Sequence, residues 1–218
     1  MSNKFVGEDD GVVAVAKLPV CLCLDTSGSM YDCIGELTEG VGEFFKAISG
    51  DEMARLCCEI SVTTFDSNVN VVQEFAMVDQ CRVPELRAYG GTEMFAGIAR
   101  ALSMLDSKKE EYKNAGVDYY QPWLVVMSDG APNSIDQSII DDLQKRQEDK
   151  KLTVFCLGIG SGADMELMRR LTKKVMKLKE HSFSAFFEWL GKSVSTVSKS
   201  QVGEKVVLPK PEEDFFEI

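Results

Sequence analysis

The sequence predicts one α/β domain, doubly wound and Rossmann-like, in which an open, mostly parallel sheet carries helices on both faces. From Leu18 onward, short β-rich runs alternate with segments of helical spacing, a pattern typical of parallel strands joined by helices. The first run is apolar almost throughout, as expected of a strand buried on both faces. A length of 218 residues with 44% hydrophobic residues suits a single domain with a sizeable core.

The first half of the domain is predicted to hold three strands and two helices. The strands cover residues 18–24, 57–65 and 69–75. Only the polar turn 66–68 separates the last two, so we expect a hairpin whose outer strand runs antiparallel at the sheet edge. Apolar residues spaced by three and four predict helices from Ile34 to near Gly50 and from about Thr92 to Tyr112.

The second half is predicted to add three strands and three helices. The strands cover 122–128, 153–157 and 175–178, for a total of six. The helices are one containing Ile135, Ile139, Ile140 and Leu143, one over 165–172, and a closing helix lined by Phe183, Phe186, Phe187, Leu190 and Val194. We divide the chain into an N-terminal extension (1–17), the domain (18–200) and a tail (201–218), which we expect to be flexible because it is acidic and contains two prolines.

Charge and cysteine content exclude several classes of function. With 24 Lys and Arg against 35 Asp and Glu, the net charge is −11, which disfavours nucleic acid or an anionic membrane as partner and favours a cation or a cationic partner. The seven cysteines are odd in number and form no C-x-x-C pair, so neither a disulfide framework nor a zinc ribbon is indicated. We expect a cytoplasmic protein, because acidic Glu8, Asp9 and Asp10 precede the apolar run where a secretory signal carries positive charge.

Oxygen-bearing side chains follow two of the predicted strands. Asp25, Ser27 and Ser29 come directly after the first strand, and Asp129 ends the strand 122–128. Thr92 opens a helix after two glycines. If the first and fourth strands are neighbours, these oxygens meet beyond the carboxyl ends of the strands, where open sheets bind ligands. Two carboxylates and three hydroxyls suit Mg²⁺ or another hard cation such as Mn²⁺ or Ca²⁺, and do not suit zinc.

This pattern, Asp-x-Ser-x-Ser with a distant Thr and a distant Asp, resembles the metal-ion-dependent adhesion site of von Willebrand factor type A (vWA) domains. Asp25, Ser27, Ser29, Thr92 and Asp129 match it position by position, and the resemblance covers roughly residues 18–198. The chain is most similar to the bacterial TerY type, cytoplasmic proteins linked to tellurium resistance. The segments that carry this similarity are LPVCLCLDTSGSM, VTTFDS, GGTEMFAGI, VVMSDGAPN, LGIGSGAD and FSAFFEWL.

The resemblance implies a metal-dependent protein-binding module and no catalysis. The ion, Mg²⁺ in the first instance, would hold a carboxylate of a partner protein, with hydroxyl oxygens from Ser27, Ser29 and Thr92 and with Asp25 and Asp129 acting partly through water. The resemblance further implies a role in a stress-response assembly. TerY-like proteins are often encoded alongside a protein phosphatase and a kinase, so these are the candidate partners. Glu93, next to Thr92, is a further candidate to tune the site or to compete for the open position.

Two other functions fit parts of the sequence. Asp25 at a strand end is similar to the nucleophile of phosphoaspartate-type phosphatases, but Ser27 stands where those enzymes carry a second acid. Gly158-x-Gly160-x-x-Ala163 follows a predicted strand and opens a helix, with Glu180 near the end of the next strand, which is the outline of a dinucleotide-binding fingerprint. Too few residues follow it for a normal cofactor domain. His181, the single histidine, is expected on a surface or loop.

Overall fold

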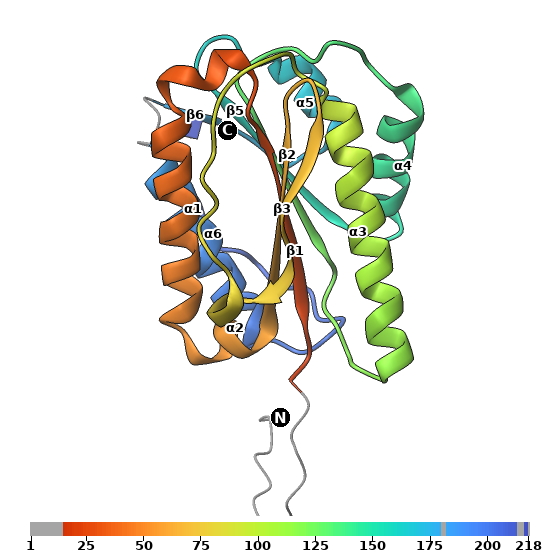
Figure 1. Cartoon of the computed structure of the whole chain (residues 1–218). Coiled ribbons are helices and arrows are strands. Elements are labelled where there is room, and N and C mark those ends of the chain that lie inside the picture. The colour runs from red at the N-terminus through yellow and green to blue at the C-terminus, as the bar shows by residue number, and fades with distance from the viewer. Residues whose placement is uncertain (1–14, 180–181, 213–215, 218) are drawn as a thin grey trace, which may run out of the picture.

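The computed structural model describes residues 15–179, 182–212 and 216–217 (Figure 1). Helices and strands alternate along most of the chain. In order they are β1 (Leu18–Asp25), η1 (Gly28–Asp32), α1 (Ile34–Ser49), α2 (Glu52–Cys57), β2 (Cys58–Phe65), β3 (Val69–Met77), η2 (Val78–Gln80), α3 (Met94–Ala115), β4 (Trp123–Ser128), α4 (Gln137–Glu148), β5 (Thr153–Ile159), α5 (Met165–Leu171), β6 (Val175–Leu178), α6 (Phe183–Ser198) and β7 (Phe216–Glu217).

The strands form one sheet in the order β3-β2-β1-β4-β5-β6-β7. The pairs β1–β2, β1–β4, β4–β5 and β5–β6 are parallel. β3 pairs antiparallel with β2 at one edge. The α/β class, the six predicted strands and the antiparallel edge strand are thereby confirmed.

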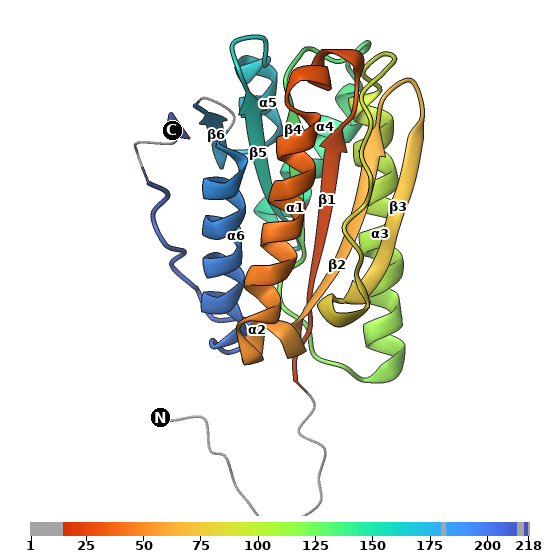
Figure 2. The same ribbon diagram turned by 60° about the vertical axis from the view of Figure 1, so that its left-hand side comes forward.

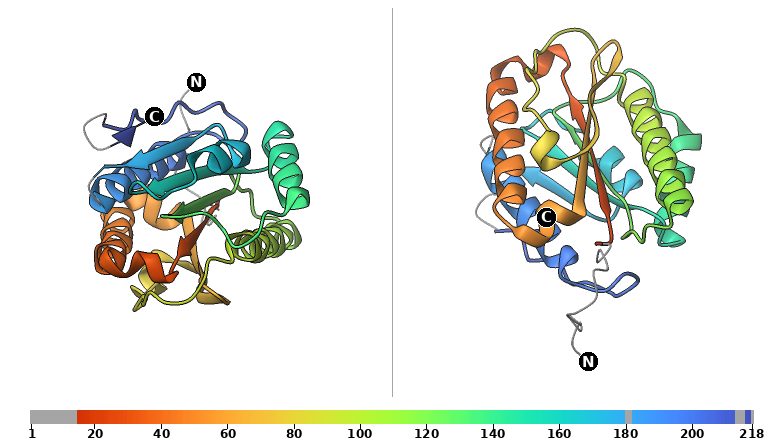
Figure 3. Two further views of the ribbon diagram at one scale, coloured as in Figure 1. Left: turned by 90° about the horizontal axis from the view of Figure 1, so that it is seen from above. Right: turned by 60° about the horizontal axis from the view of Figure 1, so that its bottom comes forward.

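Helices cover both faces of the sheet (Figures 1 and 3). α1, α2 and α6 pack on one face, and α3, α4 and α5 pack on the other. β1 contributes to both cores in turn, because successive side chains of a strand point to opposite faces. Leu22 and Leu24 enter the core beneath α1 and α6, whereas Cys21 and Cys23 enter the core beneath α3. Both cysteines are therefore core residues.

Close packing between α1 and α6 depends on a glycine. A Cβ atom at Gly40 would lie 2.6 Å from Cδ2 of Phe187, so only a residue without a side chain admits the ring. Phe187 also lies against Phe44, with ring centroids 6.0 Å apart. Because interiors are close-packed, this contact sets how near the two helices can approach.

A polar corner ties α2 to the end of α6. The Asp51 carboxylate caps α2 by accepting from the backbone of Ala54 at 3.0 Å. It also accepts from Ser195 Oγ and Lys199 Nζ, both at 2.6 Å. Burial opposes the charge, but these hydrogen bonds outweigh it and lower the pKa of Asp51 to about 2.

The structure differs from the sequence prediction in three places. α2 begins within the predicted gap, and it ends at Cys57, which was assigned to a strand. Ile135 is 54% exposed and lies outside α4, because Asp136 caps that helix by accepting from the backbone of Ser138 and Ile139. Finally, residues 216–217 of the tail pair antiparallel with β6 as a seventh strand. No helix in the described part of the chain is long and apolar enough to cross a membrane.

Candidate metal centre

The predicted site lies where β1 and β4 end. The two strands are parallel neighbours, with Leu24 opposite Met127, so Asp25 at the end of β1 comes close to Ser128 and Asp129 at the end of β4. Figure 2 shows the arrowhead of β1 at the top of the molecule, beside the turn that leads into α1. The expected neighbour relation between the first and fourth strands is confirmed.

Asp25 is fully buried, and hydrogen bonds hold both of its carboxylate oxygens. Oδ1 accepts from the backbone N–H of Ser27 at 2.8 Å, and Oδ2 accepts from the Ser128 hydroxyl at 2.5 Å. Burial raises the pKa of Asp25; the hydrogen bonds from Ser128 and Ser27 oppose this rise, and the nearby charge of Asp129 adds to it. A buried carboxylate with a second carboxylate beside it is an environment that a cation would stabilise.

The two serines of the turn and Asp129 form a chain of close oxygens. Ser27 Oγ lies 3.1 Å from Ser29 Oγ. The Ser29 hydroxyl donates to Oδ1 of Asp129 at 2.7 Å. The residues between Asp25 and Ser29 turn tightly into the 3-10 helix η1, and this turn brings the two hydroxyls together and places that of Ser29 against Asp129 at the end of β4.

Backbone hydrogen bonds fasten the loop that carries Thr92 to the serine turn. Tyr89 N donates to Thr26 O at 3.0 Å, and Gly28 N donates to Gly90 O at 3.1 Å. Gly90 adopts a left-handed φ of 78°, and a Cβ there would lie 2.7 Å from Ser67 Oγ. A glycine is therefore required by both conformation and space, which explains the first residue of the Gly-Gly pair before Thr92.

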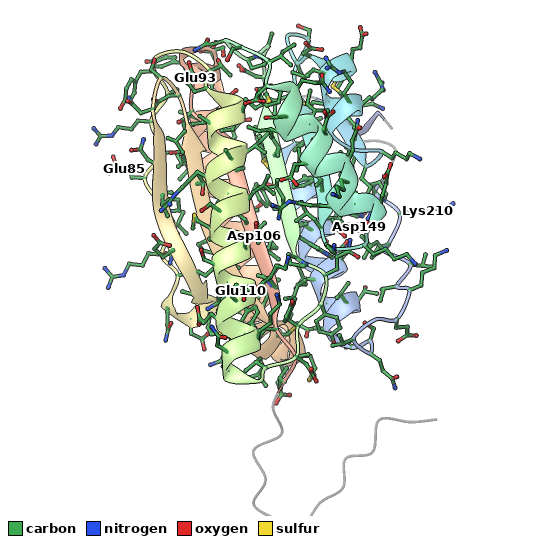
Figure 4. The ribbon with its side chains drawn as sticks, turned by 90° about the vertical axis from the view of Figure 1, so that its right-hand side faces the viewer. Glu85, Glu93, Asp106, Glu110, Asp149 and Lys210 are labelled. Carbon is green, nitrogen blue, oxygen red and sulfur yellow. The ribbon has the colours of Figure 1, made fainter. Side chains whose placement is uncertain are left out.

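Asn133 organises the neighbours of Thr92. Its Oδ1 accepts from the Thr92 backbone N–H at 3.2 Å, and its Nδ2 donates to Glu93 Oε1 at 2.8 Å. Figure 4 labels Glu93 at the top of α3, the same end of the molecule as the serine turn. Glu93 thus has a partner within the fold, and an effect of its carboxylate on an ion stays a prediction.

The donor set fits a hard divalent cation. Mg²⁺ binds oxygen at about 2.0–2.1 Å in an octahedron, so adjacent ligand oxygens lie about 2.9 Å apart. The separations Ser27–Ser29 and Ser29–Asp129, 3.1 and 2.7 Å, bracket this value. The residues described hold no cluster of three or more His, Cys, Asp or Glu that could bind a metal, so a site here would depend on hydroxyls for most of its direct ligands.

Comparison with known families decides the assignment of the fold. The profile of the von Willebrand factor type A domain matches residues 20–186. The chain belongs to this family. Members of the vWA family often mediate metal-dependent interactions between proteins. A comparison with curated protein sequences found no match.

Solved vWA structures share the fold at low sequence identity. A von Willebrand factor type A protein from Catenulispora acidiphila superposes with a TM-score of 0.63 at 16% identity over 83% of this chain and 43% of that one. The pilus adhesin SpaC of Lactobacillus rhamnosus GG gives 0.67 at 15%, over 84% and 30%. A manganese-loaded TRAP protein of Plasmodium vivax gives 0.54 at 18%, over 81% and 75%. The chain spans less than half the length of the first two.

The two alternative sites lack features that their chemistry needs. Gly158, the first glycine of the motif, lies within β5, and a Cβ there would clash with Met165 Sδ, so this glycine serves packing against α5. Asp164 occupies the N-terminus of α5 and accepts from Leu167 N at 2.9 Å, which places a carboxylate where a pyrophosphate would bind. Glu180 and His181 lie outside the described residues. In the phosphatase hypothesis the second acid stands two residues after the nucleophile, and in the structure Ser27 occupies that position beside Asp25.

Sequence reasoning named all five candidate ligands but missed the residues that orient them. Ser128 donates to Asp25, and Asn133 holds the Thr92 and Glu93 segment. Both residues lie in the VVMSDGAPN segment that supports the family resemblance. The sequence segment that contains them was therefore noticed. Their roles as hydrogen-bond donors and acceptors could not be predicted, because these depend on how separate loops pack together.

Proposed function

We propose that this vWA domain binds Mg²⁺ through Asp25, Ser27, Ser29, Thr92 and Asp129 and uses the ion to hold an acidic side chain of a partner protein. The convergence of the Ser27, Ser29 and Asp129 oxygens within hydrogen-bonding distance carries this proposal. The manganese-loaded TRAP protein, which shares the fold, supports it.

The ligand set explains why an ion would bind a further anion. Three of the five residues offer neutral hydroxyls, so the ion keeps most of its charge. Asp25 and Asp129 would act partly through water, and Asp129 already accepts from the Ser29 hydroxyl. An ion in this environment supplies an electrophilic site for one carboxylate oxygen. Without it, a chain with a net charge of −11 repels an acidic partner.

Two exposed tyrosines lie on the segments that carry the proposed ligands. Tyr31, in η1, is 75% exposed, and Tyr89, in the loop before Thr92, is 59% exposed. Tyrosine is enriched among the residues that dominate protein interfaces. We propose that these two side chains flank the partner's acidic residue. The ion would then contribute most of the affinity, and the two rings would contribute shape complementarity.

The cellular setting follows from the family resemblance. We propose a cytoplasmic, non-catalytic adaptor of the TerY type, working in a stress-response or tellurium-resistance assembly with a phosphatase or kinase as partner. The support is the set of TerY-like segments, together with an acidic charge that disfavours nucleic acid and membrane partners.

Affinity capture from native lysate, with Mg²⁺ and again with EDTA, tests the proposal. Wild type should retain a partner only with Mg²⁺, and Asp25→Ala should retain none. Asp32→Ala is the matched control, because Asp32 is an exposed acid near the site with no place among the ligands. Retention that is indifferent to chelator and to Asp25→Ala contradicts the metal-bridged mechanism.

A further inference from the structure

A cleft lies at the opposite end of the sheet from the metal centre. It has a volume of about 740 Å³ and opens where β4 and β5 begin, at Trp123 and Thr153. Residues 202–208, which follow α6, form one wall, and Figure 3 (right) shows this part of the chain running across the lower end of the molecule. The Tyr120 hydroxyl steadies that wall by donating to Ser200 O at 2.7 Å.

Positive charge gathers in this cleft although the chain as a whole is acidic. The basic residues that line it are Lys109, Lys150, Lys151, Lys174 and Lys205, against a single acid, Glu204. Lys109 and Lys151 pair with Asp106 and Asp149 at 3.5 and 2.9 Å. For the other three lysines, the described residues provide no ion-pair partner.

Two of these unpaired lysines are held in unusual ways. Lys174 Nζ lies 5.1 Å from the centre of the Phe155 ring, a contact that positions the ammonium without neutralising it. Lys150 has a φ of 55°, the left-handed conformation at the end of α4, where glycine or asparagine is preferred. At this position on the edge of the cleft, a glycine would be less strained than the lysine that is present.

Aromatic side chains border the cleft beneath the lysines. Trp123 and Tyr120 reach it only by their edges, since they are 3% and 8% exposed. Tyr119 is half-buried and offers a ring to the cleft, and Tyr112 supports it at a ring separation of 5.5 Å. The volume lies within the range of small-molecule sites, roughly 300–1,000 Å³. Aromatic surface suits a planar base, and ammonium groups suit phosphate.

We propose that this cleft binds a nucleoside polyphosphate, with the base against Tyr119 and the phosphates among Lys150, Lys174 and Lys205. The site is separate from the glycine loop after β5 and from the metal centre. Binding at this end leaves the partner-binding end free, so one chain can hold both ligands.

Titration of the full chain with mant-ATP in EDTA tests this proposal, read by energy transfer from tryptophan, since Trp123 lines the cleft. Wild type should bind saturably, and Lys174→Gln should weaken binding roughly tenfold, the effect of one charge-assisted hydrogen bond. Lys205→Gln, on the exposed wall, should weaken it similarly. Lys173→Gln is the matched control, because Lys173 is exposed and adjacent but does not line the cleft.

Competition identifies which part of the nucleotide is bound. Unlabelled ATP should compete at least tenfold better than adenosine or inorganic triphosphate. Absence of saturable binding at millimolar nucleotide, equal weakening by Lys173→Gln, or triphosphate competing as well as ATP would each overturn the proposal. Because EDTA removes the ion, and because Asp25→Ala should bind mant-ATP like wild type, the outcome is independent of the proposed partner binding.

Discussion

Replacing Asp25 by asparagine should change stability in opposite directions with and without the ion. The new side chain can accept from the Ser27 backbone through its oxygen, as Asp25 does. Its amide can donate to Ser128, which replaces the hydrogen bond from the Ser128 hydroxyl by one in the reverse direction. The variant loses a fully buried charge that lies near Asp129. In EDTA we therefore expect Asp25→Asn to raise the free energy of unfolding by about 1 kcal/mol.

Magnesium should reverse this order. An ion at one hundred times its dissociation constant stabilises the native state by about 2.7 kcal/mol, and only wild type has the carboxylate needed to bind it. For a domain of this size the gain corresponds to roughly 5–10 °C in melting temperature. The variant should melt at the same temperature with and without Mg²⁺.

Thermal melts followed by circular dichroism, in EDTA and in a Mg²⁺ series, measure both effects. The expected result is a crossing: the variant melts higher in EDTA, and wild type melts higher in excess Mg²⁺. An equal rise in melting temperature with Mg²⁺ for wild type and variant would refute the metal centre. A variant that is less stable than wild type in EDTA would refute the electrostatic argument for Asp25.

Three further substitutions, the last with a matched control, test the contacts described above. Ser128→Ala removes a donor to the buried carboxylate and should weaken Mg²⁺ binding about tenfold by calorimetric titration; unchanged affinity would mean that this hydroxyl does not orient the site. Asp51→Asn should cost about 0.5–1 kcal/mol at pH 7, since Lys199 is half exposed. Because the folded pKa of Asp51 is lowered to about 2, the stability from its ionised form is present above the unfolded value of about 3.9 and lost as pH falls through about 2, so urea melts of wild type and variant should converge in acid. Gly40→Ala should destabilise by about 1–3 kcal/mol through its clash with the ring on α6, whereas Gly35→Ala, open to solvent on the same helix, should stabilise by about 0.5 kcal/mol. Similar gains for both variants in chemical denaturation would show that helix propensity, and not packing, governs both.

The fold could be predicted because its signals are local and repeated. A strand buried on both faces must be apolar along its whole length, and β1 and β4 are buried throughout. The helices α1 and α6 show the three-and-four spacing of one buried stripe. α2 escaped prediction because six residues are too few for a periodicity, and a cap by Asp51 sets where it starts.

The candidate ligands could also be predicted, since each follows a strand or opens a helix at a position the sequence marks. Their mutual placement could not. That Ser29 reaches Asp129, one hundred residues away, depends on β1 and β4 lying side by side. That Asn133 holds Thr92 depends on how two loops meet above the sheet.

By itself, the sequence determined the α/β class, the six strands and the five residues offered as ligands, because periodicity and motif spacing are properties of the chain alone. The tertiary structure decided which oxygens converge, which hydroxyl stabilises the buried Asp25, and that residues after α6 turn back to wall a lysine-lined cleft. These features arise from contacts between distant segments. Such contacts depend on the packing of the whole sheet and its helices, which no single stretch of sequence specifies.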